Sequence, residues 1–235
     1  AAGKTRFVLY NRSGNELRVE SRTQNLYTKK LENKIFLCAM SDNGTLAVVT
    51  DDVSSMAELL VYSPAMEQQL RWNMTSNDGT PLRMAFSPDS RRLAAAAVTA
   101  GGGQMQTNLY VVTLAQGDPV NVGSQSGVPQ WVGWLSGTTL LAVYDSRAIL
   151  YNAAGGERAG IVAGLTNGFV HVEFCSGLLC LRGILPQQAK GHLKLANIEH
   201  IVLAKVAELA LARHLKGTAV YALPAHANAL RAVAA

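Results

Sequence analysis

The feature that most constrains the fold of this chain is a hairpin-like unit that recurs along the sequence. Its clearest copy is residues 84–98, where the apolar run Met84–Phe86 leads through the polar turn Ser87–Ser90 to a second apolar run beginning at Leu93. Two apolar runs around a short polar turn are typical of a β-hairpin. The same order of run, turn and run occurs at residues 36–50, 131–144 and 170–181.

The spacing between the copies indicates the type of repeat. With Gly44, Ser90, Gly137 and Gly177 as turn markers, the intervals are 46, 47 and 40 residues, close to the roughly 40 to 45 residues of a four-stranded propeller blade. Three hairpins are followed in the same phase by an aromatic or β-branched strand, at residues 59–63, 109–113 and 148–152. Such small sheets bury both faces by stacking radially. The sequence therefore predicts an all-β fold, a β-propeller of four-stranded antiparallel blades, with about five or six blades in this chain.

The first residues are predicted to form part of a blade. Phe7–Asn11 and Glu16–Ser21 would be its outer strands, with inner strands before Ala1, so that residues 1–21 make a partial blade. With the hairpins, they would belong to a ring of about seven or eight blades, closed if C-terminal strands pair with them. Propellers run long as one domain, so residues 1–235 are expected to form a single domain.

Residues 186–235 differ in composition from the rest of the chain. They contain 14 alanines, no aspartate, no serine and four of the five histidines. In one interpretation the propeller continues, with a hairpin of Val206–Arg213 and Thr218–Leu223 around Lys216-Gly217. In a second, Asn197 caps a helix that ends near Lys216, as the local propensities favour. A third is an imperfect sequence assignment. The repeat phase favours strands over the helix.

Composition and charge exclude several classes of protein. With 49% apolar and 16% charged residues, disorder is not expected, and no apolar run is long enough for a membrane span. The net charge of +5 is spread along the chain, with adjacent cations only at Lys29-Lys30 and Arg91-Arg92. Nucleic-acid binding usually needs a clustered basic surface. We therefore expect no nucleic-acid partner.

The three cysteines predict no disulfide framework. A two-residue turn at Ser176-Gly177 would pair Cys175 with Leu178 and Glu173 with Cys180, which leaves the two thiols on a diagonal too long for easy bridging. Cys38, in the apolar run before Asn43-Gly44, is expected to be a buried, reduced side chain.

The sequence contains no standard catalytic or metal-binding motif. Nucleophile-elbow, phosphate-loop, zincin and paired Cys-x-x-Cys patterns are absent from the sequence. The spacing of His192, His200 and His214, with Glu199 and Glu208 as acidic companions, matches no standard metal motif. We therefore predict no catalytic, cofactor-binding or metal-binding residues, and no cofactor.

Three further groups of residues were weighed as sites. His171 and Glu173 would share one face of a strand, an arrangement that is common without function. Asp51-Asp52 follows a predicted strand but lacks the further oxygen ligands that Ca²⁺ needs, so it is interpreted as a turn. Trp131 and Trp134 would point to opposite faces of a strand, so at most one can line a ligand surface and the other is expected in the core.

One segment carries a family resemblance. Phe86-Ser87-Pro88-Asp89-Ser90, followed by Arg91-Arg92-Leu93-Ala94, resembles the Phe-Ser-Pro-Asp-Gly hairpin of WD-repeat-like and PQQ-like propellers, with Ser90 in place of the usual glycine. The Trp-Asp and Gly-His dipeptides of the true WD repeat are absent. The pattern of residues 7–157 is most similar to an uncharacterised family of bacterial propeller proteins. That resemblance implies an extracytoplasmic location, with a membrane anchor outside this chain.

Two hypotheses of function remain. The first is a non-catalytic propeller scaffold that binds a protein partner through its loops, at the bacterial cell envelope. The alternative is a propeller enzyme or small-ligand binder that uses polar groups converging on the central channel. A channel lined by charged groups with shifted pKa values favours the alternative, and an apolar surface patch beside an inert channel favours the scaffold. The sequence favours the scaffold.

Overall fold

The chain folds into a series of small antiparallel sheets that follow one another along the sequence. The computed structural model describes residues 1–101, 103–144 and 147–154, and beyond them the backbone of the strands that lie between residues 158 and 232. Side chains are described for residues 1–100, 103–144 and 148–154. Within these residues the regular elements are all strands, so no helix that could cross a membrane is found among them.

Three sheets have the four antiparallel strands that the repeat predicts. The second sheet contains β4 (Ile35–Met40), β5 (Leu46–Thr50), β6 (Ala57–Tyr62) and β7 (Gln68–Met74). The third contains β8 (Thr80–Phe86), β9 (Arg92–Gly101), β10 (Gln104–Thr113) and β11 (Pro119–Ser126). The fourth contains β12 (Pro129–Trp134), β13 (Thr139–Tyr144), β14 (Arg147–Asn152) and β15 (Arg158–Gly164). Strand order follows chain order in all three.

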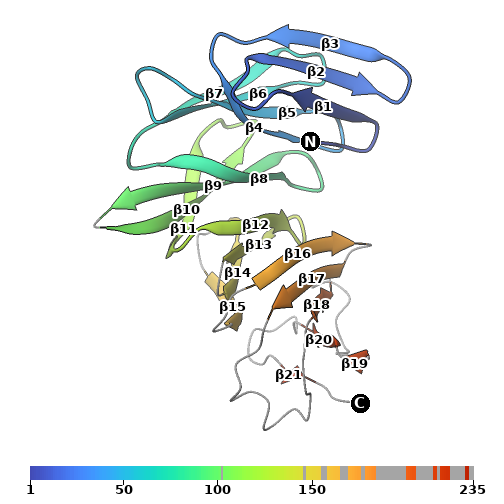
Figure 1. Cartoon of the computed structure of the whole chain (residues 1–235), viewed down its shortest axis with the longest axis vertical. Helices are drawn as coiled ribbons and strands as arrows, with labels where there is room; N and C mark the ends of the chain where they lie inside the picture. The colour runs from blue at the N-terminus through green and yellow to red at the C-terminus, as the bar shows by residue number, and fades with distance from the viewer. Residues whose placement is uncertain are drawn as a thin grey trace.

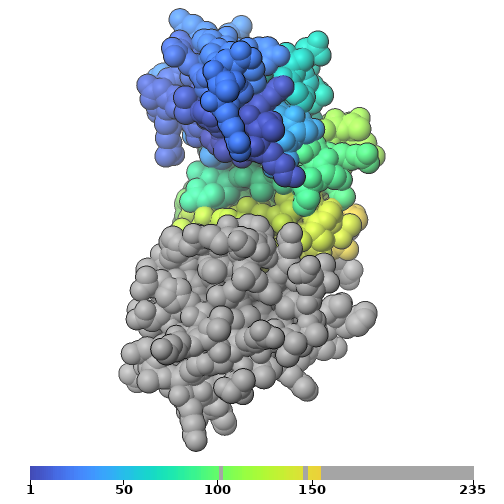
Figure 2. Space-filling view, turned by 90° about the vertical axis from the view of Figure 1, so that its right-hand side faces the viewer, coloured from blue at the N-terminus to red at the C-terminus, as the bar shows by residue number. Residues whose placement is uncertain are grey.

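The first four sheets follow one another along the long axis of the molecule (Figure 1), and Figure 2 shows the described parts of these sheets in the same order. Their first strands approach one another, since β4 contacts β8 and β8 contacts β12. Successive four-stranded antiparallel sheets that pack face to face, with their first strands in contact, are typical of the blades of a β-propeller, which confirms the predicted fold class.

The first sheet differs from the predicted partial blade. It has three strands, β1 (Arg6–Tyr10), β2 (Glu16–Ser21) and β3 (Asn25–Lys30). The sequence predicted β1 and β2 as the outer strands, but β3, which it did not suggest, pairs with β2 and is the outermost strand. On the other edge of β1, Ala2 forms a β-bridge with Phe7. Ala1–Gly3 therefore lies along the edge of β1 that β2 does not occupy.

The fifth sheet departs from the blade pattern. It contains six strands, β16 (Phe169–Cys175), β17 (Leu178–Gly183), β18 (His200–Ala204), β19 (His214–Leu215), β20 (Thr218–Ala222) and β21 (Arg231–Ala232). Strand β18 lies inside the range of the alternative helix, and its pairing with β20 is parallel rather than antiparallel. Strands thus replace the helix at these residues, while Asn197 and Val206–Arg213 lie outside the described residues.

Ring closure through the C-terminal strands is not seen. Among the described strands, those of the first sheet pair with one another and with Ala2, and none pairs with a strand of the fifth sheet. The two sheets lie at opposite ends of the molecule (Figure 1). The assignment of residues 1–235 to one domain stays a prediction.

The predicted turns share one hydrogen-bonding pattern in two sheets. Ser41 Oγ lies 2.5 Å from Asn43 Oδ1 and 3.1 Å from the carbonyl oxygen of Thr45. In the next sheet, Ser87 Oγ lies 2.5 Å from Asp89 Oδ1 and 3.2 Å from the carbonyl oxygen of Arg92. The turn chemistry therefore repeats with the fold, as expected for equivalent hairpins.

The hydrophobic cores lie between consecutive sheets. In β5, Leu46 and Val48 belong to the core shared with the first sheet, whereas Ala47 and Val49 belong to the core shared with the third. All four side chains are fully buried. Because successive residues of a strand point to opposite faces, a sheet covered on both faces needs a continuous apolar run. This explains why β5 and β9 show no polar alternation.

Candidate functional site

A polar cleft lies between the outer strands of the first and second sheets. Its volume is about 250 Å³, and residues 29–33 form one wall while Thr50, Glu58, Tyr62, Gln68 and Arg71 belong to the other. We call it the outer cleft. Strand β6 places Glu58, Leu60 and Tyr62 on one face because they are two residues apart. The adjacent strands add Thr50 opposite Glu58 and Gln68 opposite Tyr62.

Glu58 is the buried acidic group of the outer cleft, with 4% of its surface exposed. Its Oε1 atom forms an ion pair with Arg71 Nε, and Thr50 Oγ1 donates a hydrogen bond to Oε2 at 3.3 Å. Oε1 accepts no aligned hydrogen bond. A buried carboxylate needs such partners to offset its loss of hydration. The ion pair therefore fixes the position of Arg71, whose side chain is 56% exposed.

Tyr62 forms the floor of the outer cleft and is 2% exposed. The Lys29 Nζ atom lies 4.2 Å from the centroid of its ring, a cation–π contact that joins β3 to β6. Burial raises the pKa of the Tyr62 phenol, the Glu58 carboxylate raises it further, and Arg71 lowers it. The phenol is therefore protonated at neutral pH and can take part in hydrogen bonding, but not as an anion.

The charges of the outer cleft favour an anionic ligand. Lys29, Lys30 and Arg71 contribute three positive charges, whereas Glu32 and Glu58 contribute two negative ones. Among the described residues, the one ion pair within this set is that of Glu58 with Arg71. The two lysine ammonium groups have no carboxylate partner in the described part of the chain, and the Arg71 side chain is 56% exposed.

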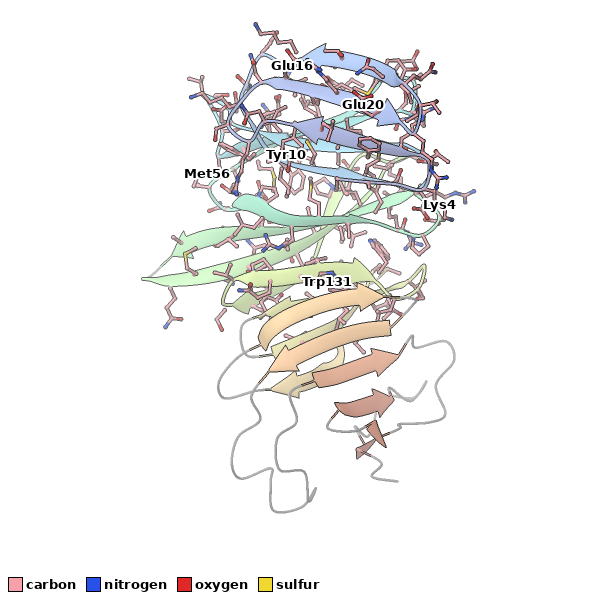
Figure 3. The ribbon with its side chains drawn as sticks, turned by 45° about the vertical axis from the view of Figure 1, so that its right-hand side comes forward. Lys4, Tyr10, Glu16, Glu20, Met56 and Trp131 are labelled. Carbon is pink, nitrogen blue, oxygen red and sulfur yellow. The ribbon has the colours of Figure 1, made fainter. Side chains whose placement is uncertain are left out.

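Three exposed apolar side chains lie in or beside the loops at one end of the second and third sheets. Val53 is 101% exposed and Met56 51% exposed in the loop between β5 and β6, and Met105 is 46% exposed at the start of β10. These loops join the second and third strands of adjacent sheets, so they lie at the same end of the stack. Figure 3 shows Met56 on the same side as the tip of β9 and β10, opposite Lys4. We call this surface the loop end.

The innermost strands carry little charge. Of the three that belong to complete sheets, β4, β8 and β12, a charged residue occurs only in β8, where Arg83 Nε donates to the carbonyl oxygen of Gln130 at 2.8 Å. Phe36, Met84 and Phe86 on these strands pack against the core between the second and third sheets. Arg83 is therefore the one charged residue that these three strands contribute.

The structure places Asp51 and Asp52 in the loop between β5 and β6. Asp51 Oδ1 accepts a hydrogen bond from the Lys34 amide at 2.7 Å, and Asp52 Oδ2 accepts from the hydroxyls of Ser55 at 2.6 Å and Ser54 at 2.9 Å. These serine hydrogen bonds lower the pKa of Asp52. Among the described residues, no group of three His, Cys, Asp or Glu side chains could hold a metal ion.

The two tryptophans point in opposite directions, as expected. Trp134 is 8% exposed in the core between the third and fourth sheets, and its Nε1 donates to the carbonyl oxygen of Ala85 at 3.0 Å. Trp131, labelled in Figure 3, lies on the other face of β12, and its ring occupies the space that a Cβ atom at Gly133 would take. Trp134 is therefore a core residue.

The cysteine predictions can be compared with the strand register. Strand β16 pairs Cys175 with Leu178 and Glu173 with Cys180, which confirms the predicted diagonal. Cys38 is free and 6% exposed, and burial raises the pKa of its thiol to about 12. It is a buried, reduced side chain, as predicted.

The histidines considered above as candidate metal or acid–base residues lie in the part of the chain where no side chain is described. His171 and Glu173 are both on β16, His200 begins β18 and His214 begins β19. Their side chains lie outside the described part of the chain, as do His192, Glu199 and Glu208 altogether.

Sequence reasoning missed the outer cleft. One signal was present, because Glu58 is a charged residue within the otherwise apolar run Ala57–Tyr62. A carboxylate in a strand buried on both faces needs a partner. Its partner Arg71 lies on the next strand, and the opposite wall comes from β3, a strand that the sequence did not suggest.

Comparison with known proteins gives a family match and a fold. The model of DUF5711, described as a family of unknown function, matches residues 1–158. No curated protein matches the sequence.

Solved structures of similar fold are β-propeller proteins. Sqt1 of Saccharomyces cerevisiae has a TM-score of 0.54 at 10% identity, with 73% of this chain and 51% of that chain covered. Atg21, in the complex of KlAtg21 with the coiled coil of AgAtg16, has a TM-score of 0.57 at 12% identity, with 77% of this chain and 61% of that chain covered. A gluconolactonase of Xanthomonas campestris has a TM-score of 0.54 at 13% identity, with 75% of this chain and 64% of that chain covered. The chain thus spans less than two thirds of each structure, and the similarity is one of fold.

Proposed function

Because this chain belongs to the DUF5711 family, a family of unknown function, we propose its function from its surface: it is a non-catalytic β-propeller scaffold that binds a protein partner. The observation that carries the proposal is the exposed apolar loop end, where Val53, Met56 and Met105 project from two neighbouring sheets. Exposed apolar side chains gathered on one surface are typical of interaction sites. Methionine suits such sites because its side chain is unbranched and adaptable.

Two further observations support the scaffold over the enzyme. The complete sheets place apolar rather than charged residues on their innermost strands, with Arg83 as the exception. Atg21, one of the proteins with a similar fold, was solved in complex with a coiled coil, which shows that this fold can present a surface to another protein. Loops on a rigid sheet scaffold are common carriers of binding function.

Site-specific photo-crosslinking tests this proposal. A photoreactive benzoyl-phenylalanine at position 53 or 105 of the full-length protein, irradiated in the cells that produce it, should give a discrete adduct of defined mass. The control is position 120, because Val120 is 53% exposed on β11, away from the loop end. Equal adducts at position 120, or none at positions 53 and 105, would contradict a partner at the loop end.

The second part of the proposal concerns location. We propose that the scaffold works at the extracytoplasmic face of the bacterial cell membrane, held there by an anchor outside this chain. The support is the resemblance of residues 7–157 to bacterial propeller proteins of that arrangement. Protease added to spheroplasts should degrade the propeller while a cytoplasmic marker stays intact, and protection of the propeller in intact spheroplasts would contradict this location.

A further inference from the structure

We propose that the outer cleft binds a small organic anion, a carboxylate or a phosphate ester, through Lys29 and Arg71. This goes beyond the proposed scaffold function, because none of Val53, Met56 and Met105 lines the cleft. The cleft is formed by the facing strands β3, β6 and β7, whereas the proposed partner surface is formed by loops.

The size of the cleft limits the ligand. A volume of about 250 Å³ corresponds to roughly eight water molecules at their share of liquid volume. A ligand of roughly ten non-hydrogen atoms would therefore fill it. Inorganic phosphate is smaller than this.

The charge of the cleft determines the sign of the ligand. Glu58 is paired with Arg71, and it forms no ion pair with Lys29 or Lys30. Lys29 is held on the Tyr62 ring, 4.2 Å from its centroid, and has no carboxylate partner among the described residues. Glu32 is the remaining acidic residue of the lining, against Lys29 and Lys30. An oxyanion that meets Lys29 and the outer nitrogens of Arg71 would form charge-assisted hydrogen bonds.

The buried Glu58 shows that Arg71 is held in place before a ligand binds. The carboxylate, 4% exposed, contacts the Nε atom of Arg71, whose side chain is 56% exposed and so can be reached by another acceptor. Such a preorganised guanidinium loses less side-chain entropy when it binds a planar or tetrahedral oxyanion. Glu58 is thus a positioning residue for Arg71. The amide of Gln68 and the hydroxyl of Thr50 in the same lining can bond to hydroxyl groups of the ligand.

Titration calorimetry of the complete chain tests the proposal. The probes are glycerol 3-phosphate for a phosphate ester and malate for a carboxylate, with uncharged glycerol as the neutral probe. We expect saturable binding of at least one anion at millimolar concentration or below, with affinity that falls as salt is added. Whichever anion binds identifies the oxyanion that the cleft prefers.

Variants separate the cleft from the general charge of the protein. Lys29→Met keeps an unbranched side chain over Tyr62 and should weaken anion binding about tenfold, the effect of one lost charge-assisted contact. Arg22→Met removes one positive charge from an exposed residue outside the lining and should leave the affinity unchanged. The pair Glu58→Gln and Arg71→Gln is made together, so that no buried charge is left alone, and should weaken binding at least tenfold while thermal unfolding shows a folded protein.

Three results would overturn the proposal. They are the absence of saturable binding of both anions at concentrations up to about 10 mM, equal binding of glycerol, and equal weakening by Lys29→Met and Arg22→Met. The photo-crosslinks at positions 53 and 105 do not depend on this cleft, so either proposal can fail while the other stands.

Discussion

Ser90 has an unusual backbone conformation for its residue type. Its φ angle is +58°, whereas the equivalent turn position of the second sheet is Gly44 with φ +92°. The left-handed region costs a residue with a Cβ atom about 1–2 kcal/mol, and glycine adopts it freely. The hairpin therefore keeps the repeated turn with a less suitable residue.

We expect Ser90→Gly to stabilise the protein. The gain is the relief of the left-handed backbone, reduced by the larger entropy of glycine in the unfolded chain, so the free energy of unfolding should rise by about 0.5–1 kcal/mol. Chemical denaturation measures it. The matched control is Ser76→Gly, at an exposed turn residue without positive φ, which should destabilise slightly. Equal effects of the two substitutions would show that Ser90 is not strained.

Cys38 makes the free energy of unfolding depend on pH in the alkaline range. Burial raises the pKa of its thiol from the ordinary 9.0 to about 12, so the unfolded chain loses this proton at a lower pH than the folded protein does. The contribution of Cys38 is therefore fully present below pH 9 and is lost as the pH rises towards 12, by about 1.4 kcal/mol per pH unit.

Comparison with Cys38→Ala isolates this effect. Urea unfolding at pH 8 and at pH 10.5 should show that the stability advantage of the unsubstituted protein over the variant shrinks by about 1–2 kcal/mol. Groups common to both proteins, such as Tyr110 with its pKa raised to about 12 by burial and by Asp78, cancel in the difference. An unchanged advantage would mean that the thiol is accessible to solvent in the folded protein.

At the scale of single strands, β9 shows how tightly neighbouring sheets pack. Its residues Leu93–Ala97 are all fully buried, with Ala94 and Ala96 in the core facing the fourth sheet and Leu93 and Ala97 in the core facing the second. Small side chains on both faces let the two neighbouring sheets approach closely. A larger residue has no free volume to occupy.

Ala96→Leu should therefore destabilise the protein by about 1–3 kcal/mol, because the added atoms overpack the core between the third and fourth sheets. Thermal and urea denaturation report the change. Ala115→Leu is the matched control, since Ala115 is exposed in the turn between β10 and β11; its effect should stay within about 0.5 kcal/mol. A neutral Ala96→Leu would indicate unfilled space at this position.

Periodic features of the elements were predictable from the sequence. The spacing of the turns predicted the four-stranded sheets. The alternation of side-chain direction along a strand predicted that Trp131 and Trp134 lie on opposite faces of β12. Strand β3 was missed because Asn25–Lys30 is polar and half exposed, without the apolar run on which the prediction relied. The outer cleft was missed for the same reason, since one of its walls follows from β3. Pairing between distant segments, such as the parallel contact of β18 with β20, leaves no local pattern in the sequence.

At the scale of the whole molecule, each described core joins only two neighbouring sheets. Leu17 of the first sheet packs with Leu46 of the second, and Leu140 of the fourth packs with Leu109 of the third. Proteins built of units that contact only their neighbours unfold in parts, because the loss of one interface leaves the distant units packed. Stability should therefore be distributed along the stack rather than shared as one core.

Hydrogen exchange measured by mass spectrometry after Leu17→Ala tests this distribution. Leu17 is fully buried, and the truncation should cost about 2–5 kcal/mol at the interface of the first and second sheets. We expect faster exchange in β1, β2 and β3 while β9 and β10 keep their protection. Leu140→Ala is the reciprocal control, at an equally buried residue of β13. It should speed hydrogen exchange in β12 and β13 while β1 and β2 stay protected. Equal acceleration in all strands with either variant would mean that the sheets unfold as one cooperative unit, whose stability is set by the closure of the stack rather than by its separate interfaces.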